Sequence, residues 1–404
     1  MKQKLGFVWL GIVICFAVGS CGISELDVQK KDDANGVWVG PSMDVSPSVR
    51  SVTYFSVFDY PDGYDWRSDP ERGEIKCSLV VYKDEFPVLK VPVGNDYNVS
   101  PDPDMHRIIQ GHLYTDFSTS SQTIIKRDGK PLFSYPESEM ICDLAVNGEN
   151  VHTIGHSRSG QGFSYRINGE VVIERETGYT FERLTIEDST ISFAFAEPIS
   201  SAEGTIERYY IMCNGKVSQV ALRDDIKKVW DVAHYKGQVY YLATLTGVAA
   251  PVIVSEQGKS ALTMPSSMSL VSCRMNLTSD GICVEGVLSD KKQVQCVLWG
   301  TNRQYQLFPK GMIFSALCLG DDGVHCTMNP TTGTAAGLIY RAGETITLPS
   351  GYSCRSRSAM DFASGMLTVG LSSSAEARPA LWVDGQIKSL DANGYISDVE
   401  IIVL

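Results

Sequence analysis

The stretch Leu381-Trp382-Val383-Asp384-Gly385 brings an apolar run to a tight Asp-Gly turn, and a second alternating run follows it. Asp-Gly and Asn-Gly suit such hairpin turns because they tolerate a positive φ at both central positions. The same element recurs eight times after residue 50, and successive turns lie 40 to 46 residues apart. The eight turns are Lys83-Asp84-Glu85, Arg127-Asp128-Gly129, Ile167-Asn168-Gly169, Asn214-Gly215-Lys216, Gln257-Gly258-Lys259, Thr301-Asn302-Arg303, Ala342-Gly343-Glu344 and Val383-Asp384-Gly385.

A second hairpin lies between these turns, for example in residues 141–154 around Asn147-Gly148. Each unit therefore has four strands. One small sheet cannot bury both of its faces, so neighbouring units must stack, and this period is typical of four-stranded propeller blades. The sequence predicts an all-β fold, a β-propeller.

The two ends of the repeat region predict how the ring closes. Residues 395–404 form a first strand with no partner after it, and residues 51–58 form a second strand with no partner before it. We expect these strands to pair and complete one blade, which gives eight blades. Seven blades is the alternative, if the first unit with its long insert is not a blade.

The N-terminus resembles a bacterial lipoprotein signal. Lys2 and Lys4 precede an apolar run, and the segment Val18-Gly19-Ser20-Cys21 fits the lipobox pattern of an aliphatic residue, two small residues and cysteine. The resemblance implies that residues 1–20 are a removed signal peptide and that Cys21 carries acyl chains such as palmitate. Residues 21–50 are polar and contain prolines, so we expect a flexible tether, with residues 51–404 forming one propeller domain.

The charge excludes one class of partner. The chain has a net charge of −12, and removal of residues 1–20 takes away two lysines and no acid. Binding to nucleic acid needs a concentrated basic surface, so we expect no nucleic-acid partner. The expected membrane contact is the lipid anchor.

Nine cysteines remain after residue 21, and none has metal-ligand spacing. Two pairs are candidates for cross-strand disulfides, Cys318 with Cys326 and Cys283 with Cys296. The alternative is that these residues are small buried hydrophobic side chains. His152 and His156 share a strand face but have no third ligand nearby, so we predict neither a metal site nor a cofactor.

The long loops of the predicted blades all lie on one rim, and binding residues are commonly displayed on such loops. The densest candidate is the insert after residue 58, where aromatic side chains alternate with charged ones, as in sugar-binding sites. The alternative is that its aromatic residues pin the insert to the neighbouring blade. The candidate ligand-binding residues are Tyr60, Tyr64, Asp65, Trp66, Arg67, Tyr97 and His106.

The units at Leu381-Trp382-Val383-Asp384-Gly385 and Val297-Leu298-Trp299-Gly300 resemble the degenerate Leu-Trp-x-x-Gly blades of envelope lipoproteins of Gram-negative bacteria. The resemblance spans most of residues 51–404. It implies a propeller fold and a lipid-anchored place in the cell envelope, at the outer membrane, facing the periplasm or the cell surface. It carries no active-site residue to this chain.

These observations predict a non-catalytic protein that binds a glycan or an envelope protein through its long-loop face. The first alternative is a polysaccharide hydrolase or lyase with carboxylates at the mouth of the central channel. The second is a structural envelope protein whose loops are inert. We name no catalytic residue, because adjacent acids such as Asp224-Asp225 point to opposite faces of a strand.

Overall fold

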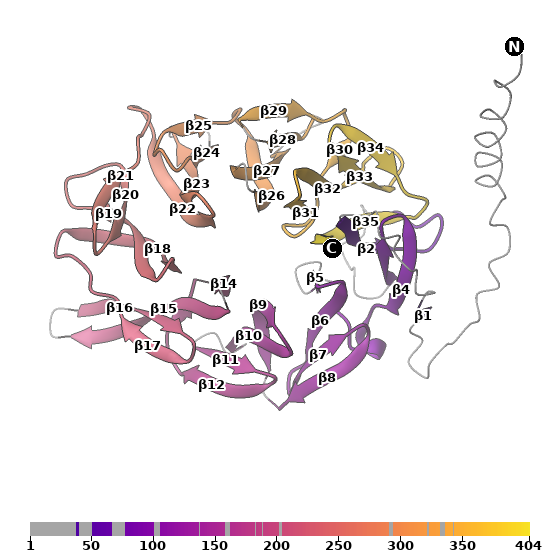
Figure 1. Ribbon diagram of the computed structural model, residues 1–404, viewed down its shortest axis with the longest axis horizontal. Coiled ribbons are helices and arrows are strands. Elements are labelled where there is room, and N and C mark those ends of the chain that lie inside the picture. The colour runs from indigo at the N-terminus through magenta and orange to yellow at the C-terminus, as the bar shows by residue number, and fades with distance from the viewer. Residues whose placement is uncertain are drawn as a thin grey trace, which may run out of the picture.

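The fold is an eight-bladed β-propeller, described here from a computed structural model (Figure 1). Eight antiparallel sheets surround one axis, and the first strand of each blade is the one nearest that axis. The structure describes residues 38–39, 51–66, 77–100, 106–136, 138–157, 162–181, 183–187, 189–201, 204–290, 294–320, 323–331, 336–341 and 343–404. The predicted signal peptide, Cys21 and Arg67 lie outside these residues.

Blades 1 to 4 are numbered in the order of their strands along the chain. From the axis outward, blade 1 contains β35 (Gly394–Val403), β2 (Ser51–Asp59), β3 (Ser78–Lys83), β4 (Phe86–Pro92) and β1 (Trp38–Val39). A 3-10 helix, η1 (Asn95–Tyr97), precedes blade 2, which contains β5 (His106–Ile109), β6 (His112–Ser118), β7 (Thr123–Arg127) and β8 (Lys130–Tyr135). Blade 3 contains β9 (Glu139–Asn147), β10 (Asn150–Ser157), β11 (Phe163–Ile167) and β12 (Glu170–Arg175). Blade 4 contains β13 (Tyr179–Thr180), β14 (Thr185–Glu187), β15 (Thr190–Ser201), β16 (Gly204–Cys213) and β17 (Lys216–Gln219).

The other four blades complete the circle. Blade 5 contains β18 (Ile226–Tyr235), β19 (Gln238–Leu245), β20 (Pro251–Ser255) and β21 (Gly258–Ala261). Blade 6 contains β22 (Ser269–Thr278), β23 (Gly281–Ser289), β24 (Val294–Trp299) and β25 (Tyr305–Leu307). Blade 7 contains β26 (Met312–Gly320), β27 (Gly323–Pro330), β28 (Leu338–Arg341) and β29 (Glu344–Thr347). Blade 8 contains β30 (Tyr352–Ser353), β31 (Met360–Ala363), β32 (Met366–Ser373), β33 (Pro379–Val383) and β34 (Gln386–Ser389).

The predicted eight blades and the predicted ring closure are both confirmed. β35 pairs with β2 in an antiparallel register that runs from Ser51↔Val403 to Asp59↔Gly394. The outer hairpin turns also adopt the expected backbone: Asn168 and Gly169 have φ values of 51° and 85°, and Asp384 and Gly385 have 44° and 95°. These positive values explain why Asn-Gly and Asp-Gly recur at these turns.

Apolar side chains fill the interfaces between neighbouring blades. The cluster between blades 8 and 1, for example, includes Phe55, Trp382 and Ile396, all of them buried. No helix among the described residues is long and apolar enough to cross a membrane.

The structure contradicts both candidate disulfides, because the strand registers separate the sulfur atoms. Cys318 pairs with His325 and Cys326 pairs with Leu317, so the two cysteines lie on opposite faces of their sheet. Cys296 pairs with Val287, four residues along β23 from Cys283 and therefore about 13 Å away, beyond the reach of a disulfide. All four are thiols rather than halves of a disulfide; Cys283, Cys296 and Cys326 are buried, in agreement with the alternative of small buried side chains, and Cys318 is half-buried.

Candidate functional site

The aromatic residues of the insert after β2 are mostly part of the core rather than of a binding surface. Trp66 is 2% exposed and Tyr60 is 4% exposed. The Trp66 ring packs on Tyr395 of β35, with ring centroids 5.1 Å apart, and its Nε1 donates a hydrogen bond to the carbonyl of Ala377 at 3.0 Å. A sugar cannot stack on either buried ring in this conformation, so these contacts favour the alternative in which the insert is pinned to the neighbouring blade.

The other candidates for the glycan site do not form one surface. Tyr64 is half-buried and stacks on Tyr60, while Asp65 is exposed. His106 is 1% exposed, and its Nε2 donates a hydrogen bond to the carbonyl of Ser100 at 2.7 Å. Burial lowers the pKa of His106 to about 3. Tyr97, at the end of η1, keeps an exposed ring.

A different region, between blades 6 and 7, contains a cavity of about 570 Å³. That volume lies within the range of sites that bind small molecules. β22, β23 and β24 supply one wall, β26 supplies the other, and Arg357 reaches in from the segment between β30 and β31. The lining residues are Ser272, Cys273, Arg274, Asn276, Glu285, Gly286, Val287, Cys296, Ile313, Phe314, Ser315, Ala316, Leu317 and Arg357.

The cavity contains a charged cross-strand pair at a position whose residues vary from blade to blade. In blade 3 the first two strands pair Asp143 with Ile154, and in blade 5 they pair Asp231 with Leu242. Both apolar residues are fully buried in the core between blades. At the same distance from the hairpin turn, blade 6 pairs Arg274 with Glu285. Blade 2 has Asp116 and blade 7 has Thr327 at this position, so the position accepts polar as well as apolar residues.

Arg274 occupies the position that Asp143 has in blade 3 and Asp231 has in blade 5, and these aspartates bond to the next blade. The Asp231 carboxylate accepts a hydrogen bond from the backbone N–H of Met275 in the next blade at 2.7 Å, and Asp143 accepts one from Leu184 at the same distance. An arginine at this position has no oxygen to accept such a bond. The guanidinium of Arg274 instead lines the cavity.

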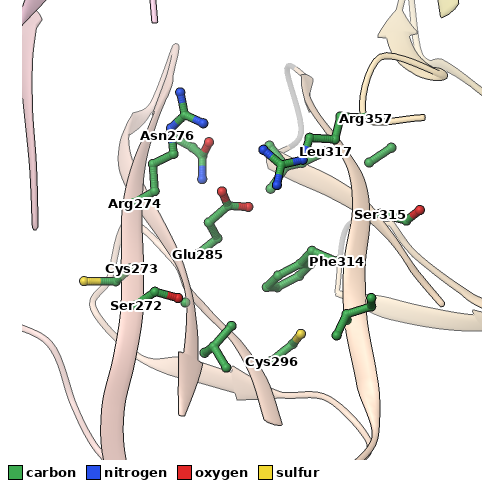
Figure 2. Close-up of a pocket in the computed structure, with 14 residues that line it drawn as sticks. Ser272, Cys273, Arg274, Asn276, Glu285, Cys296, Phe314, Ser315, Leu317 and Arg357 are labelled. Atoms are coloured by element: carbon green, nitrogen blue, oxygen red, sulfur yellow. The ribbon is translucent and has the colours of Figure 1, made fainter. Parts of the chain in front are cut away.

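Glu285 projects into the cavity between its two walls. Figure 2 shows its carboxylate between Arg274 on one side and Arg357 and Phe314 on the other. Burial raises the pKa of Glu285, and the positive charges of Arg274, Arg357 and Arg183 partly oppose that rise. Within the part of the chain that the structure describes, no group donates a hydrogen bond to this carboxylate and no cation forms an ion pair with it.

A second polar group in the cavity is also unsatisfied. The Asn276 Nδ2 is buried and has no acceptor among the described residues. Buried polar atoms in native proteins nearly always have a partner, and one without a partner requires an explanation. The buried Asn276 donor and the Glu285 carboxylate, which accepts no hydrogen bond from a described residue, are suited to a bound molecule with several hydroxyl groups.

The repeat alignment gives only a weak indication of this site, and the long loops give none. Aligning the repeats by their hairpin turns places Glu285 at the position of Ile154 and Leu242. The same alignment places Asp116 there in blade 2, so a charge at this position does not by itself distinguish blade 6. The cavity is not visible in the sequence, because β26 and the segment around Arg357 form part of it.

Among the described residues, no group of His, Cys, Asp and Glu side chains has the arrangement to hold a metal ion. The cysteine thiols near the cavity are buried. Burial raises the pKa of Cys296 to about 11 and that of Cys273 above its usual range. These thiols are therefore neutral at physiological pH and are poor nucleophiles.

Comparisons with known proteins identify no family for this chain. No family model matches the chain, and no curated protein matches it. The β-propeller domain of the Trilobed protease from Pyrococcus furiosus is 11% identical, with a TM-score of 0.45, 74% of this chain covered and 92% of that one. TolB from Acinetobacter baumannii is 12% identical, with a TM-score of 0.34 and coverage of 71% and 81%.

A puromycin-hydrolyzing peptidase of Mycobacterium tuberculosis is 8% identical, with a TM-score of 0.44 and 72% of this chain covered. This chain spans about half of that peptidase, 53% of its length. Similarities at this level concern the propeller alone and carry no residue role.

Proposed function

We propose that this chain is a non-catalytic binding protein of the bacterial cell envelope, anchored through acyl chains on Cys21, and that it binds a glycan unit in the cavity between blades 6 and 7. The observation that carries the proposal is the Glu285 carboxyl, placed without a hydrogen-bond partner in a cavity large enough for a sugar. The location moves the predicted glycan site away from the insert around Trp66, whose ring is buried.

The chemistry of the walls supports a sugar as the ligand. The half-buried ring of Phe314 offers an apolar face on which the C–H groups of a sugar ring can stack. The Asn276 amide and the Glu285 carboxylate can exchange hydrogen bonds with hydroxyl groups. This combination of one aromatic face with a few converging polar groups is typical of sites for small polar molecules.

The proposal is tested by thermal unfolding and titration calorimetry of the full chain with a panel of neutral and acidic saccharides. A ligand present at a hundred times its Kd stabilises the folded chain by about 2.7 kcal/mol. We expect Phe314→Ala to weaken binding by about 1 kcal/mol, roughly fivefold, because the stacking surface is lost. Asn276→Ala should weaken binding without lowering stability, since its Nδ2 has no partner to lose in the folded chain.

Phe86→Ala is the matched control, because Phe86 is an exposed phenylalanine on β4 of blade 1. It should leave saccharide binding unchanged. Failure of every saccharide to shift unfolding, or equal effects of Phe86→Ala and Phe314→Ala, would overturn the proposal.

A further inference from the structure

The charges in the cavity define which sugars fit it best. Arg274 and Arg357 both line the cavity and face the single carboxylate of Glu285 (Figure 2). A third guanidinium, that of Arg183, acts on the same carboxyl from blade 4 and forms an ion pair with Asp231 at 3.2 Å. With Arg183 neutralised by Asp231, the two lining arginines still exceed the one lining carboxylate.

The two lining arginines differ in their contacts with the rest of the protein. The Arg274 Nη2 donates a hydrogen bond to the carbonyl of Phe181 at 3.5 Å, a long contact, whereas Arg357 is exposed at the cavity rim. Guanidinium groups bind carboxylates with two parallel hydrogen bonds, which gives both affinity and orientation. A carboxylate on the ligand is the partner that these side chains favour.

We infer that the glycan unit recognised here is acidic, that its carboxylate binds between Arg274 and Arg357, and that Glu285 takes up a proton when this ligand binds. The inference rests on the proposed function. It names the class of sugar, one that carries a carboxylate, such as a uronic acid, and it gives Glu285 the role of coupling affinity to pH.

Proton uptake follows from the geometry of one cavity with two carboxyl groups. When the ligand carboxylate enters, it takes over the arginine charges that oppose protonation of Glu285, and it adds a negative charge nearby. A second carboxylate in the same site raises the pKa of the first, so Glu285 binds a proton more readily when the ligand is present. Burial already favours the protonated form of Glu285 by raising its pKa in the empty cavity. As an acid, Glu285 can then donate a hydrogen bond to the ligand.

The other charged or titratable groups that face Glu285 are three arginines, one aspartate and two thiols. The arginines stay protonated, and burial raises the pKa of the Cys296 thiol to about 11 and that of the Cys326 thiol well above its usual value. The Asp231 carboxylate is held by Arg183 and the Met275 N–H. The groups are Arg274 on β22, Arg357 before β31, Arg183 before β14, Asp231 on β18, Cys296 on β24 and Cys326 on β27.

Galacturonic acid and galactose form the matched pair of ligands, because they differ only in a carboxylate or hydroxymethyl group at one carbon. We expect titration calorimetry of the full chain to give at least tenfold tighter binding of galacturonate at pH 5.5. Arg357→Ala should remove most of that preference. Arg357 is exposed, so the folded chain should tolerate its loss.

Arg355→Ala is the control variant for charge. Arg355 is also exposed and lies two residues away, but its guanidinium lies over the Trp66 ring, 5.2 Å from the ring centroid. The Arg355→Ala variant removes one positive charge outside the cavity, so its affinity for galacturonate should stay within about twofold of that of the unchanged chain.

The pH dependence tests the role of Glu285. Between pH 5 and 8 the ligand stays ionised, and its affinity should fall as the pH rises, because proton uptake by Glu285 becomes harder. Glu285→Gln should abolish this fall, and titrations of the unchanged chain in buffers of different ionisation enthalpy should report proton uptake.

The outcomes separate the two proposals. Binding of neither sugar class overturns the proposed function and this inference together. Equal binding of galacturonate and galactose overturns the inference alone and leaves a neutral glycan as the ligand. Affinity for galacturonate that rises with pH overturns the proton uptake by Glu285.

Discussion

Glu139 and Arg166 form a buried ion pair inside blade 3. The Arg166 Nη2 lies 2.8 Å from the Glu139 Oε1, and both side chains are almost fully buried. Glu139 also accepts hydrogen bonds from the Ser164 and Tyr135 hydroxyls, at 2.7 and 3.1 Å. The Arg166 guanidinium lies over the Tyr135 ring, 4.0 Å from its centroid. This carboxylate is satisfied on every side, in contrast to that of Glu285, and its role is structural.

Arg166→Ala should lower the free energy of unfolding by about 3 to 5 kcal/mol, because it leaves the Glu139 carboxylate buried without a counter-ion. Urea denaturation followed by tryptophan fluorescence measures the change. Lys310→Ala, which removes a cation from the exposed pair with Asp290, should cost less than about 1 kcal/mol. Equal losses in the two variants would contradict the structural role assigned to the buried pair.

At the scale of elements, the insert after β2 fastens the two ends of the chain together. The backbone N–H of Tyr60 donates to the carbonyl of Asn393 at 2.8 Å, and the Asn393 Nδ2 donates to the carbonyls of Pro61 and Tyr64. Trp66 adds its contacts with Ala377 and Tyr395. The described part of the insert therefore joins blade 1 to blade 8 beside the β2–β35 pair.

Trp66→Ala should destabilise the chain by about 3 to 5 kcal/mol, because it removes a large buried side chain and leaves a cavity. Its saccharide affinity should not change, since Trp66 is not among the residues that line the blade 6–7 cavity. Thermal unfolding and calorimetry of the same sample measure both properties. Tyr97→Ala, which removes an exposed ring, is the control for stability. Lost saccharide binding with unchanged stability would return the glycan site to this insert.

At the scale of the whole molecule, carboxylates of inner strands join blades around the ring. Asp143, Asp231, Asp361 and Asp398 each accept a hydrogen bond from a backbone N–H in the following blade. The two bonds from Asp361 and Asp398 flank the ring closure, because their donors are Ile401 on β35 and Ile108 on β5. Several of these carboxyls are buried, so the stability of the ring should depend on pH.

Burial raises the pKa of Asp398 to about 8, against the opposing charge of Arg107 and with a further rise from Glu400. The folded chain therefore keeps a proton that the unfolded chain releases above about pH 4, so stability is lost as the pH rises toward 8. The pKa of His106 is lowered to about 3. The folded chain therefore loses stability through His106 only below about pH 6.5, where the unfolded chain binds a proton that the folded chain does not. The window from pH 6.5 to 8 therefore excludes His106, and the variant below separates Asp398 from other carboxyls whose pKa burial raises, such as Glu400 and Asp361.

We expect the free energy of unfolding to fall by about 2 kcal/mol from pH 6.5 to 8 because of Asp398, and Asp398→Asn to remove that part of the slope. Urea denaturation at several pH values measures it. Glu376→Gln, at an exposed carboxylate in blade 8, is the control and should keep the slope of the unchanged chain. An unchanged slope in Asp398→Asn would contradict the assignment.

The sequence by itself determined the eight blades and the strand pairing that closes the ring, because local turn chemistry and alternating strands repeat in every unit. Cross-strand partners were harder to predict, since the number of residues in each turn sets the register: Cys326 pairs with Leu317 rather than Cys318, and Cys296 pairs with Val287 rather than Cys283. Tertiary structure alone decided that Trp66 is buried against β35, and that Arg274, Glu285, Phe314 and Arg357 meet in one cavity. Burial and cavities arise where strands far apart in the chain pack together, and a local pattern does not encode that packing.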